Sequence, residues 1–418
     1  MNEKYCYALA GGSVLVSALW IGFGGLHEHQ NADSIVPVLV SLQKWTPFYW
    51  EADRVGMLVP LLAMPFRNPL RNLIVQTVLD TTGVLAASFL LARYVLGPSP
   101  TTMAAAALSN IWWFLLTPRL IQFHWLVVQA TYGLSITLGV LALLTRRRAL
   151  AIVLIALAHW VNVTVFLVLV PLVALRNLAH RDRRELPRSI ILIVIGSVSG
   201  WLLMMSASYR ATVLGFDPVT LWLPAWGQLA RQAQHFLFPN AWILLWLLIP
   251  APGALLFARQ HVVVSVGLLV SAIGYWLLVG TMAWVRINHY SPGYLVPAFV
   301  LISLAFATLA VAPFERYGRQ LWVAMATAMV ASAAWTSGWP SVTTVRQALD
   351  RHGKSTPAII DSHATVISGN YWMMWPAVFH ANLVAYERGL NRQFYGDGER
   401  GRVTRSLWPE TYLTYDIP

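Results

Sequence analysis

Long apolar segments separated by short polar ones occupy most of the chain. Segments of about 17–25 apolar residues recur along its length, and each could cross a hydrocarbon core of about 30 Å. An outer-membrane barrel would instead show segments of roughly ten residues with alternating polarity. The pattern therefore predicts an all-α polytopic membrane protein. Its eleven predicted transmembrane helices are 6–25, 73–96, 102–117, 125–145, 149–160, 162–175, 188–207, 237–257, 262–284, 293–312 and 320–337.

Two apolar segments between the first and second of these helices are too short to span. Residues 34–45 and 55–66 are predicted to be juxtamembrane helices that lie on the membrane surface with their apolar sides down. Both belong to a predicted first external loop, 26–72. Because the residues after 337 are more polar, we expect a transmembrane module over 1–337 and a small extracytoplasmic domain over 338–418.

Basic residues gather at the ends of apolar segments. The chain is 57% hydrophobic, 11% charged and has a net charge of +12, whereas a soluble domain has roughly 25% charged residues. The clusters at 146–148, 176–188 and 316–319 fit the rule that positive charge stays on the cytoplasmic side. The charge thus indicates topology and contact with membrane lipids, not nucleic-acid binding. It predicts a cytoplasmic N-terminus and an extracytoplasmic C-terminus, and it leaves open whether 149–175 crosses once or twice.

Carboxylates are concentrated in the first external loop, which contains Glu28, Asp33, Glu51 and Asp53. Asp33 opens the segment 34–45, so its side chain could cap that helix. Alternatively, a carboxylate that is partly desolvated at a membrane interface could be a general base that takes a hydroxyl proton. Glu28 lies between two histidines, but three adjacent residues lack a specific metal-ligand spacing. No metal site is predicted, and a requirement for a divalent metal stays open.

Aromatic residues accompany the second pair of acids. Glu51, Asp53 and Arg54 follow the sequence Pro-Phe-Tyr-Trp, residues 47–50. They could form a solvated ion pair in an interfacial turn beside an aromatic belt. They could equally line a groove in which acids accept hydrogen bonds from sugar hydroxyls and aromatic rings cover the sugar faces.

Basic residues occur in two other predicted external loops. Arg119 and His124 lie in one, and Arg286, His289 and Tyr290 lie in the other. A lone arginine at a helix end usually extends its charge to the interface. Several basic residues on one face of a bundle point instead to a phosphate on a lipid, because arginine holds phosphate oxygens in a bidentate fork.

The order of these features resembles the membrane glycosyltransferases of the GT-C fold. This group includes protein O-mannosyltransferases, the aminoarabinose transferases of lipid A, and many bacterial lipopolysaccharide and cell-wall glycosyltransferases. Asn31–Ser34 stands where such enzymes hold their catalytic acidic residue. Asn288–Pro292 is similar to the Arg-Tyr-x-x-Pro start of a late helix, with His289 at the basic position. Gly369–Pro376 looks like an external Tyr-Trp segment of bacterial relatives.

The resemblance implies a GT-C-like bundle in a bacterial inner membrane and a polyprenyl-phosphate sugar as donor. One sugar would pass, with inversion, to a hydroxyl of an extracytoplasmic glycan or glycolipid acceptor, and Asp33 would be the general base. The residues implied for the donor phosphate are Arg119, Arg286, His289 and Tyr290. The residues implied for the sugar or acceptor are Glu28, Glu51, Asp53, Arg54, His124, Tyr371 and Trp372.

Two other classes of membrane protein fit the same helical pattern. A transporter or flippase of a lipid-linked saccharide should show paired ionisable groups near the midplane and two related halves. An O-antigen polymerase or ligase would place its essential residues in a large late loop. The role of the tail 338–418 also has two interpretations. Asp361, His363 and Trp375 could line an acceptor groove, or they could belong to a cap that packs on the helical bundle.

Overall fold

The computed structural model describes residues 3–50, 55–180, 185–206, 215–237, 259–397 and 405–417. Glu51, Asp53 and Arg54, together with the predicted helix 237–257 beyond its first residue, lie outside the described residues.

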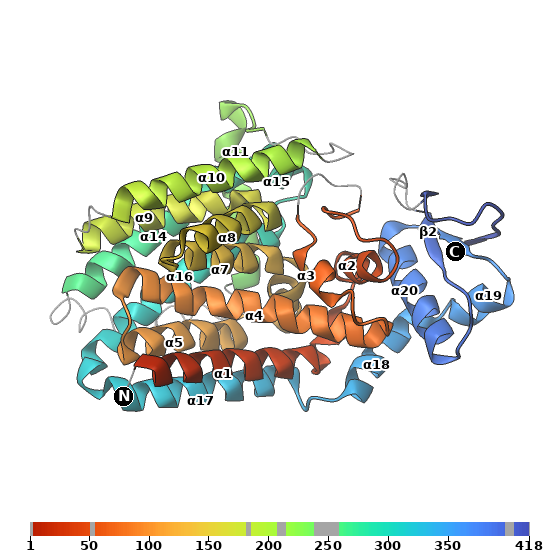
Figure 1. Ribbon diagram of the computed structural model, residues 1–418, viewed down its shortest axis with the longest axis horizontal. Coiled ribbons are helices and arrows are strands. Elements are labelled where there is room, and N and C mark those ends of the chain that lie inside the picture. The colour runs from red at the N-terminus through yellow and green to blue at the C-terminus, as the bar shows by residue number, and fades with distance from the viewer. Residues whose placement is uncertain are drawn as a thin grey trace.

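Most of the described chain forms a bundle of long helices (Figure 1). Four of them, α1, α4, α5 and α17, pack side by side along the longest axis. Helices α7, α8, α9, α10, α14 and α16 complete the bundle on one side of α4 and α5. Their bounds are α1 Glu3–Gly22, α4 Pro69–Leu96, α5 Pro100–Leu116, α7 Ala130–Leu144, α8 Arg148–Val161, α9 Phe166–His180, α10 Glu185–Met205, α14 Arg259–Gly280, α16 Val296–Val311 and α17 Gly318–Ser337.

Short helical segments connect the long helices. Helix α6 continues into the π-helical turn η2, and the chain then bends by 52° into α7. The other connecting segments between α8 and α17 are single turns or short helices, except for α11, which has 16 residues. The bounds are α6 Arg119–Phe123, η2 His124–Val128, η3 Val163–Val165, η4 Val219–Leu221, α11 Trp222–Leu237, α15 Ala283–Ile287, η5 Pro292–Leu295 and η6 Ala312–Tyr317.

Local sequence explains why these helices begin and how they pack. The Asn68 side chain accepts a hydrogen bond from the backbone of the first turn of α4, and proline follows it at the first helical position, where a missing N–H costs nothing. Small residues let the helices approach closely. A Cβ on Gly133 of α7 would lie 2.6 Å from the Cα of Val84 in α4, so this crossing requires glycine.

The described residues contain six helical stretches that are long and apolar enough to cross a membrane, or seven if α6, η2 and α7 form one span. The sequence predicted eleven crossings. Helix α8 shows why the two numbers differ, because its 14 residues extend about 21 Å, less than a hydrocarbon core of about 30 Å. At Asn162 the backbone is extended and separates α8 from η3 and α9. The chain is a helical protein suited to multiple membrane crossings.

The segment predicted as the first external loop contains η1 Gly25–His29, α2 Ala32–Leu42 and α3 Leu58–Ala63. The prediction that α2 lies on the membrane surface with its apolar side down is wrong. Ile35, Val38 and Leu39 are fully buried, because α2 packs between α4 and the tail helix α20, Tyr371–Glu387. Its apolar residues therefore contact protein. Helix α3 covers only six residues of the predicted 55–66.

The tail contains helices and a small sheet. Its helices are α18 Val342–Asp350, η7 Arg351–Gly353, α19 Thr356–Asp361 and α20, and α20 contacts a sheet of three short parallel strands. Strand β1, Val366–Ser368, lies between β2, Tyr395–Asp397, and β3, Thr414–Asp416. One apolar cluster joins α2 and α4 to α18, α19 and α20, so the first loop and the tail share a core.

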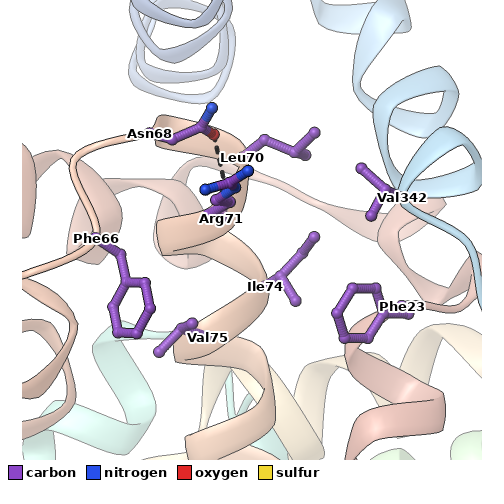
Figure 2. A pocket seen from close by; sticks show the side chains of 8 residues that line it. All are labelled: Phe23, Phe66, Asn68, Leu70, Arg71, Ile74, Val75 and Val342. Atoms are coloured by element: carbon purple, nitrogen blue, oxygen red, sulfur yellow. Dashed lines mark hydrogen bonds between the residues drawn. The ribbon is translucent and has the colours of Figure 1, made fainter.

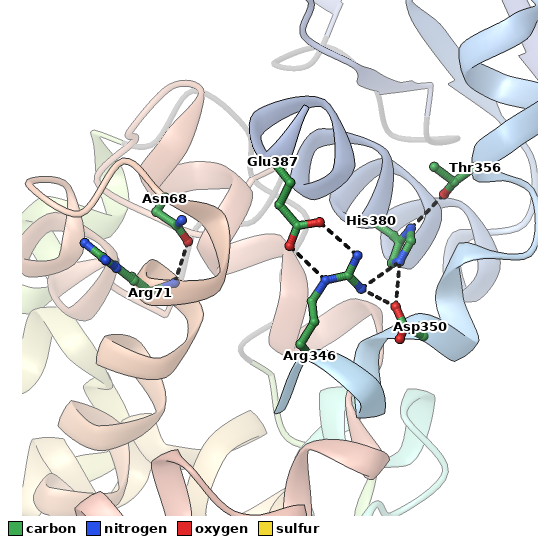
Figure 3. A network of polar contacts seen from close by, with 7 residues as sticks. All are labelled: Asn68, Arg71, Arg346, Asp350, Thr356, His380 and Glu387. Carbon is green, nitrogen blue, oxygen red and sulfur yellow. Dashed lines mark hydrogen bonds and ion pairs between the residues drawn. The ribbon is translucent and has the colours of Figure 1, made fainter. Parts of the chain in front are cut away.

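An ion-pair network ties α18 to α20 (Figure 3). The Nε and Nη2 atoms of Arg346 donate to the two carboxylate oxygens of Glu387 at 2.8 and 2.9 Å. Its Nη1 donates to Asp350 and lies 3.3 Å from Nε2 of His380. The other ring nitrogen of His380 lies 2.8 Å from the hydroxyl oxygen of Thr356. The network fixes the tail helices over α2.

Arg93 and two basic residues of the predicted cytoplasmic cluster 176–188 lie at the far end of α4. The Arg93 guanidinium lies 4.3 Å from the centre of the Tyr7 ring, and the His180 ring lies 2.8 Å from the carbonyl oxygen of Val95. Arg188 donates to the backbone just after α7. Helix α2, in contrast, contacts the first turns of α4. The 28 residues of α4 separate the two ends by about 42 Å.

Candidate functional site

Asn31, not Asp33, caps helix α2. The Asn31 side chain accepts from the backbone N–H of Ser34 at 3.2 Å, and the Ser34 hydroxyl oxygen accepts from the backbone N–H of Asn31 at 3.0 Å. This reciprocal pair satisfies the start of the helix. The alternative in which Asp33 is the cap is wrong, and its carboxylate is left for another partner.

That partner is Tyr371, which lies 338 residues away at the start of α20. The Tyr371 hydroxyl donates to Oδ1 of Asp33 at 2.8 Å. The same hydroxyl is 2.6 Å from that of Tyr49. Because the Tyr371 proton goes to the carboxylate, Tyr49 is the donor of the second bond. The exposed ring of Trp372 stands edge-on against Tyr371, with 5.1 Å between ring centres.

The surroundings of Asp33 make its carboxylate more basic. Burial between α2 and α20 raises the pKa of Asp33 above its ordinary value, and the hydrogen bond from Tyr371 opposes part of that rise. Desolvation disfavours the charged form of an acid. A half-buried carboxylate with a raised pKa accepts a proton more readily than an ordinary aspartate.

A second polar group lies on η1, just before α2. Oε1 of Glu28 is 3.2 Å from Nη2 of Arg119 and 3.3 Å from Nε2 of His29. The His29 ring also lies against Phe123 of α6, with 6.2 Å between ring centres. From the tail, Arg351 donates to the carbonyl oxygen of Gln30 at 2.7 Å. The segment that leads to Asp33 is thus held by the bundle on one side and by the tail on the other.

A third group lies at α15. The Nε atom of Arg286 donates to both carboxylate oxygens of Asp217, at 2.9 and 3.1 Å. The Asp217 side chain is only 2% exposed, whereas that of Arg286 is 45% exposed. His289 and Tyr290 follow with φ of 53° and 54°, a left-handed conformation that is uncommon for residues other than glycine. The turn after α15 is therefore sharp.

His124 connects this turn to the loop that carries Arg119. Its Nε2 lies 3.4 Å from the Ser291 hydroxyl oxygen. A Cβ on Gly293 would be 2.7 Å from the same nitrogen, so the turn approaches the ring closely. The two loops with predicted phosphate-binding residues meet here. However, Arg119 and Arg286 each hold a carboxylate, Glu28 and Asp217 respectively.

The structure brings together some of the predicted site residues. It joins Asp33 to Tyr371, whose ring contacts Trp372, and it joins Glu28 to Arg119. Trp375, a candidate for an acceptor groove, is buried against Trp50 instead. Across the described ranges, no group of three or more His, Cys, Asp or Glu could hold a metal ion.

Three residues of these groups were not assigned a role from the sequence. Tyr49 belongs to the aromatic segment 47–50 before Glu51, and this segment could have indicated a role for it. Its position in the sequence gives no indication of the contact with Tyr371. Asp217 and Arg351 carried no signal, because each acts through a contact distant in the sequence. Comparisons with protein-family models, with curated proteins and with solved structures find no match to this chain.

Proposed function

We propose that the protein is a glycosyltransferase of the GT-C type. It would move one sugar from a polyprenyl-phosphate donor to a hydroxyl of an extracytoplasmic glycan or lipid. The observation that carries the proposal is the Asp33 carboxylate, held at 2.8 Å by the Tyr371 hydroxyl outside the apolar bundle. A lone structural aspartate in a first helical turn needs no such partner from a distant helix.

In the proposed reaction, Asp33 takes the proton of the acceptor hydroxyl. The acceptor oxygen then forms a bond to the anomeric carbon from the side opposite the lipid phosphate. The bond between that carbon and the phosphate oxygen breaks, and the polyprenyl phosphate leaves with the electron pair. The configuration inverts because attack and departure occur on opposite faces. A raised pKa at Asp33 matches the demand on a general base.

Basic residues would stabilise the departing phosphate. Arg119 and Arg286 are each about half exposed, and a guanidinium has five N–H donors. Each can therefore keep its carboxylate and still donate to phosphate oxygens. His124 and His289 lie beside the turn after α15, and Tyr290 follows. These groups are the proposed electrostatic contacts of the leaving group.

The arrangement of charge supports the proposed orientation. Arg93, His180 and Arg188 meet at one end of the bundle, and Asp33 lies at the other. With the basic end in the cytoplasm, Asp33 and the tail lie on the extracytoplasmic side of a bacterial inner membrane. In this proposal α16 and α17 cross separately, and the shorter helices α5 and α7 are further crossings. Helix α8 does not span alone, and the total of about eleven crossings stays a prediction.

The test is transfer by purified protein in detergent, where no bilayer exists. Radiolabelled polyprenyl-phosphate hexoses and pentoses are supplied with envelope glycan and glycolipid acceptors. The proposal expects label in an acceptor and release of polyprenyl phosphate. A transporter or flippase would give neither, but would move the labelled lipid across proteoliposomes. A polymerase or ligase would instead transfer whole oligosaccharides from a lipid carrier.

A further inference from the structure

An apolar cavity with an arginine at its rim lies away from Asp33, at the start of α4. It has a volume of about 450 Å³, within the range of about 300–1,000 Å³ of small-molecule sites. Figure 2 shows its lining from three segments: Phe23 after α1, Phe66 with the first turns of α4, and Val342 of α18. Apart from Asn68 and Arg71, every lining side chain is apolar.

Arg71 is the charged group at this cavity. Its backbone N–H donates to Asn68, but within the described part of the chain its guanidinium has no hydrogen-bond or ion-pair partner. Arg67 is also exposed, one residue before the Asn68 cap. Within the described residues neither arginine side chain has an ion-pair partner. Exposed cations beside an apolar cavity fit a ligand that has an anionic head and a hydrocarbon body.

Aromatic residues place the cavity at the membrane interface. Trp335 and Trp339 are 85% and 81% exposed, and the edge of Trp20 packs against Trp339 at 6.2 Å between ring centres. Exposed tryptophans of membrane proteins gather at the level of the lipid headgroups. Phe23 follows Trp20 by three residues and Val342 follows Trp339 by three, so the cavity lies at the same depth.

We propose that this cavity binds one anionic phospholipid, with an acyl chain between Phe23, Phe66 and Val342 and the headgroup phosphate on Arg71. Both ends of such a lipid match the cavity. Apolar side chains line the part that would hold the acyl chain, and Arg71 at the rim is a bidentate donor for the phosphate. The site is separate from the proposed catalytic residues, since none of its lining residues contributes to the Asp33, Glu28 or Asp217 groups.

The test is native mass spectrometry of the delipidated full-length protein in detergent. Phosphatidylglycerol and phosphatidylcholine with identical acyl chains are titrated separately. We expect one phosphatidylglycerol bound more tightly than phosphatidylcholine. Arg71→Gln should weaken phosphatidylglycerol binding by about fivefold, the factor for one arginine at an anionic surface. It should weaken phosphatidylcholine binding by less, because the choline ammonium offsets the charge of that phosphate. The exposed Arg388, directly after α20 in the tail, gives the matched control Arg388→Gln, which should change neither.

A second variant fills the apolar part of the cavity. Val342→Trp, at a position that is 51% exposed, should weaken both lipids without disturbing the core. An unchanged preference for phosphatidylglycerol in Arg71→Gln would overturn the proposal, and so would unchanged binding in Val342→Trp. Polyprenyl phosphate is the third ligand. Displacement of phosphatidylglycerol by equimolar polyprenyl phosphate in an Arg71-dependent manner would assign the cavity to the lipid-linked substrate and refute the phospholipid assignment.

Discussion

Removing the Tyr371 hydroxyl should shift the pH dependence of transfer. In the folded protein this hydroxyl donates to Asp33 at 2.8 Å and so favours the ionised carboxylate. Tyr371→Phe deletes that bond and keeps the ring, including its edge contact with Trp372. Burial then acts on the pKa of Asp33 without opposition. The pKa should rise further.

The size of the shift follows from the strength of the bond. A hydrogen bond to a charged group contributes about 1.5–3 kcal/mol, and one pKa unit corresponds to about 1.4 kcal/mol. The full range is therefore about one to two units. Because Asp33 is only half-buried, water replaces part of the lost bond, and we expect about one unit.

The sign of the effect is definite. A general base works when deprotonated, so activity is lost as the pH falls through its pKa. Raising the pKa moves this acid limb to higher pH. The assay is kcat/KM for sugar transfer from about pH 5 to about pH 9. Tyr49→Phe is the matched comparison: its hydroxyl contacts Tyr371 and should produce a smaller shift. An acid limb that stays in place or moves to lower pH in Tyr371→Phe would refute the reasoning.

Three further predictions concern stability, measured as the Tm in detergent. Arg286→Gln removes the ion-pair partner of the buried Asp217 carboxylate and should lower the Tm. Adding Asp217→Asn to this variant should restore most of the loss. An equal loss of Tm in the single and the double variant would contradict the pairing. Gly133→Ala should cost about 1–3 kcal/mol by overpacking, while Gly274→Ala, with no atom within 4 Å of the new Cβ, should not lower the Tm. Burial lowers the pKa of His352 from 6.5 to about 4 in the folded protein, so the unfolded chain binds more protons between these two pH values. The Tm should therefore decline as the pH falls from 6.5 to about 4. His352→Gln should reduce this decline.

The positions of the long helices could be predicted from the sequence because apolar length alone determines them. The predicted 188–207 and the observed α10, Glu185–Met205, differ by only a few residues. The burial of α2 could not be predicted, because an amphipathic segment has the same pattern whether lipid or protein covers it. Here α20 covers it, more than 300 residues later in the chain.

In the candidate site, too, the sequence indicates individual residues, whereas the contacts between them depend on the tertiary structure. Asp33 was singled out because this acid-poor chain gathers carboxylates in the loop and because Asn31–Ser34 resembles the catalytic segment of GT-C enzymes. Its catalytic role stays a prediction. Its partner Tyr371 was predicted as a sugar or acceptor contact, and the contact with Asp33 itself came only from the tertiary structure. The pairing of Arg119 with Glu28 and of Arg286 with Asp217 likewise depends on helix packing. Such contacts leave no periodic signal in a sequence.

The most direct test of the central claim is the rate of sugar transfer by Asp33→Asn. Purified variant and wild type are compared with a radiolabelled polyprenyl-phosphate sugar under single-turnover conditions. Glu315→Gln, which removes an exposed carboxylate in η6, is the matched control, and the Tm and elution volume confirm the fold. Loss of a general base predicts a fall in rate of at least about 100-fold for Asp33→Asn and no change for Glu315→Gln. Transfer by Asp33→Asn at the wild-type rate would contradict the account.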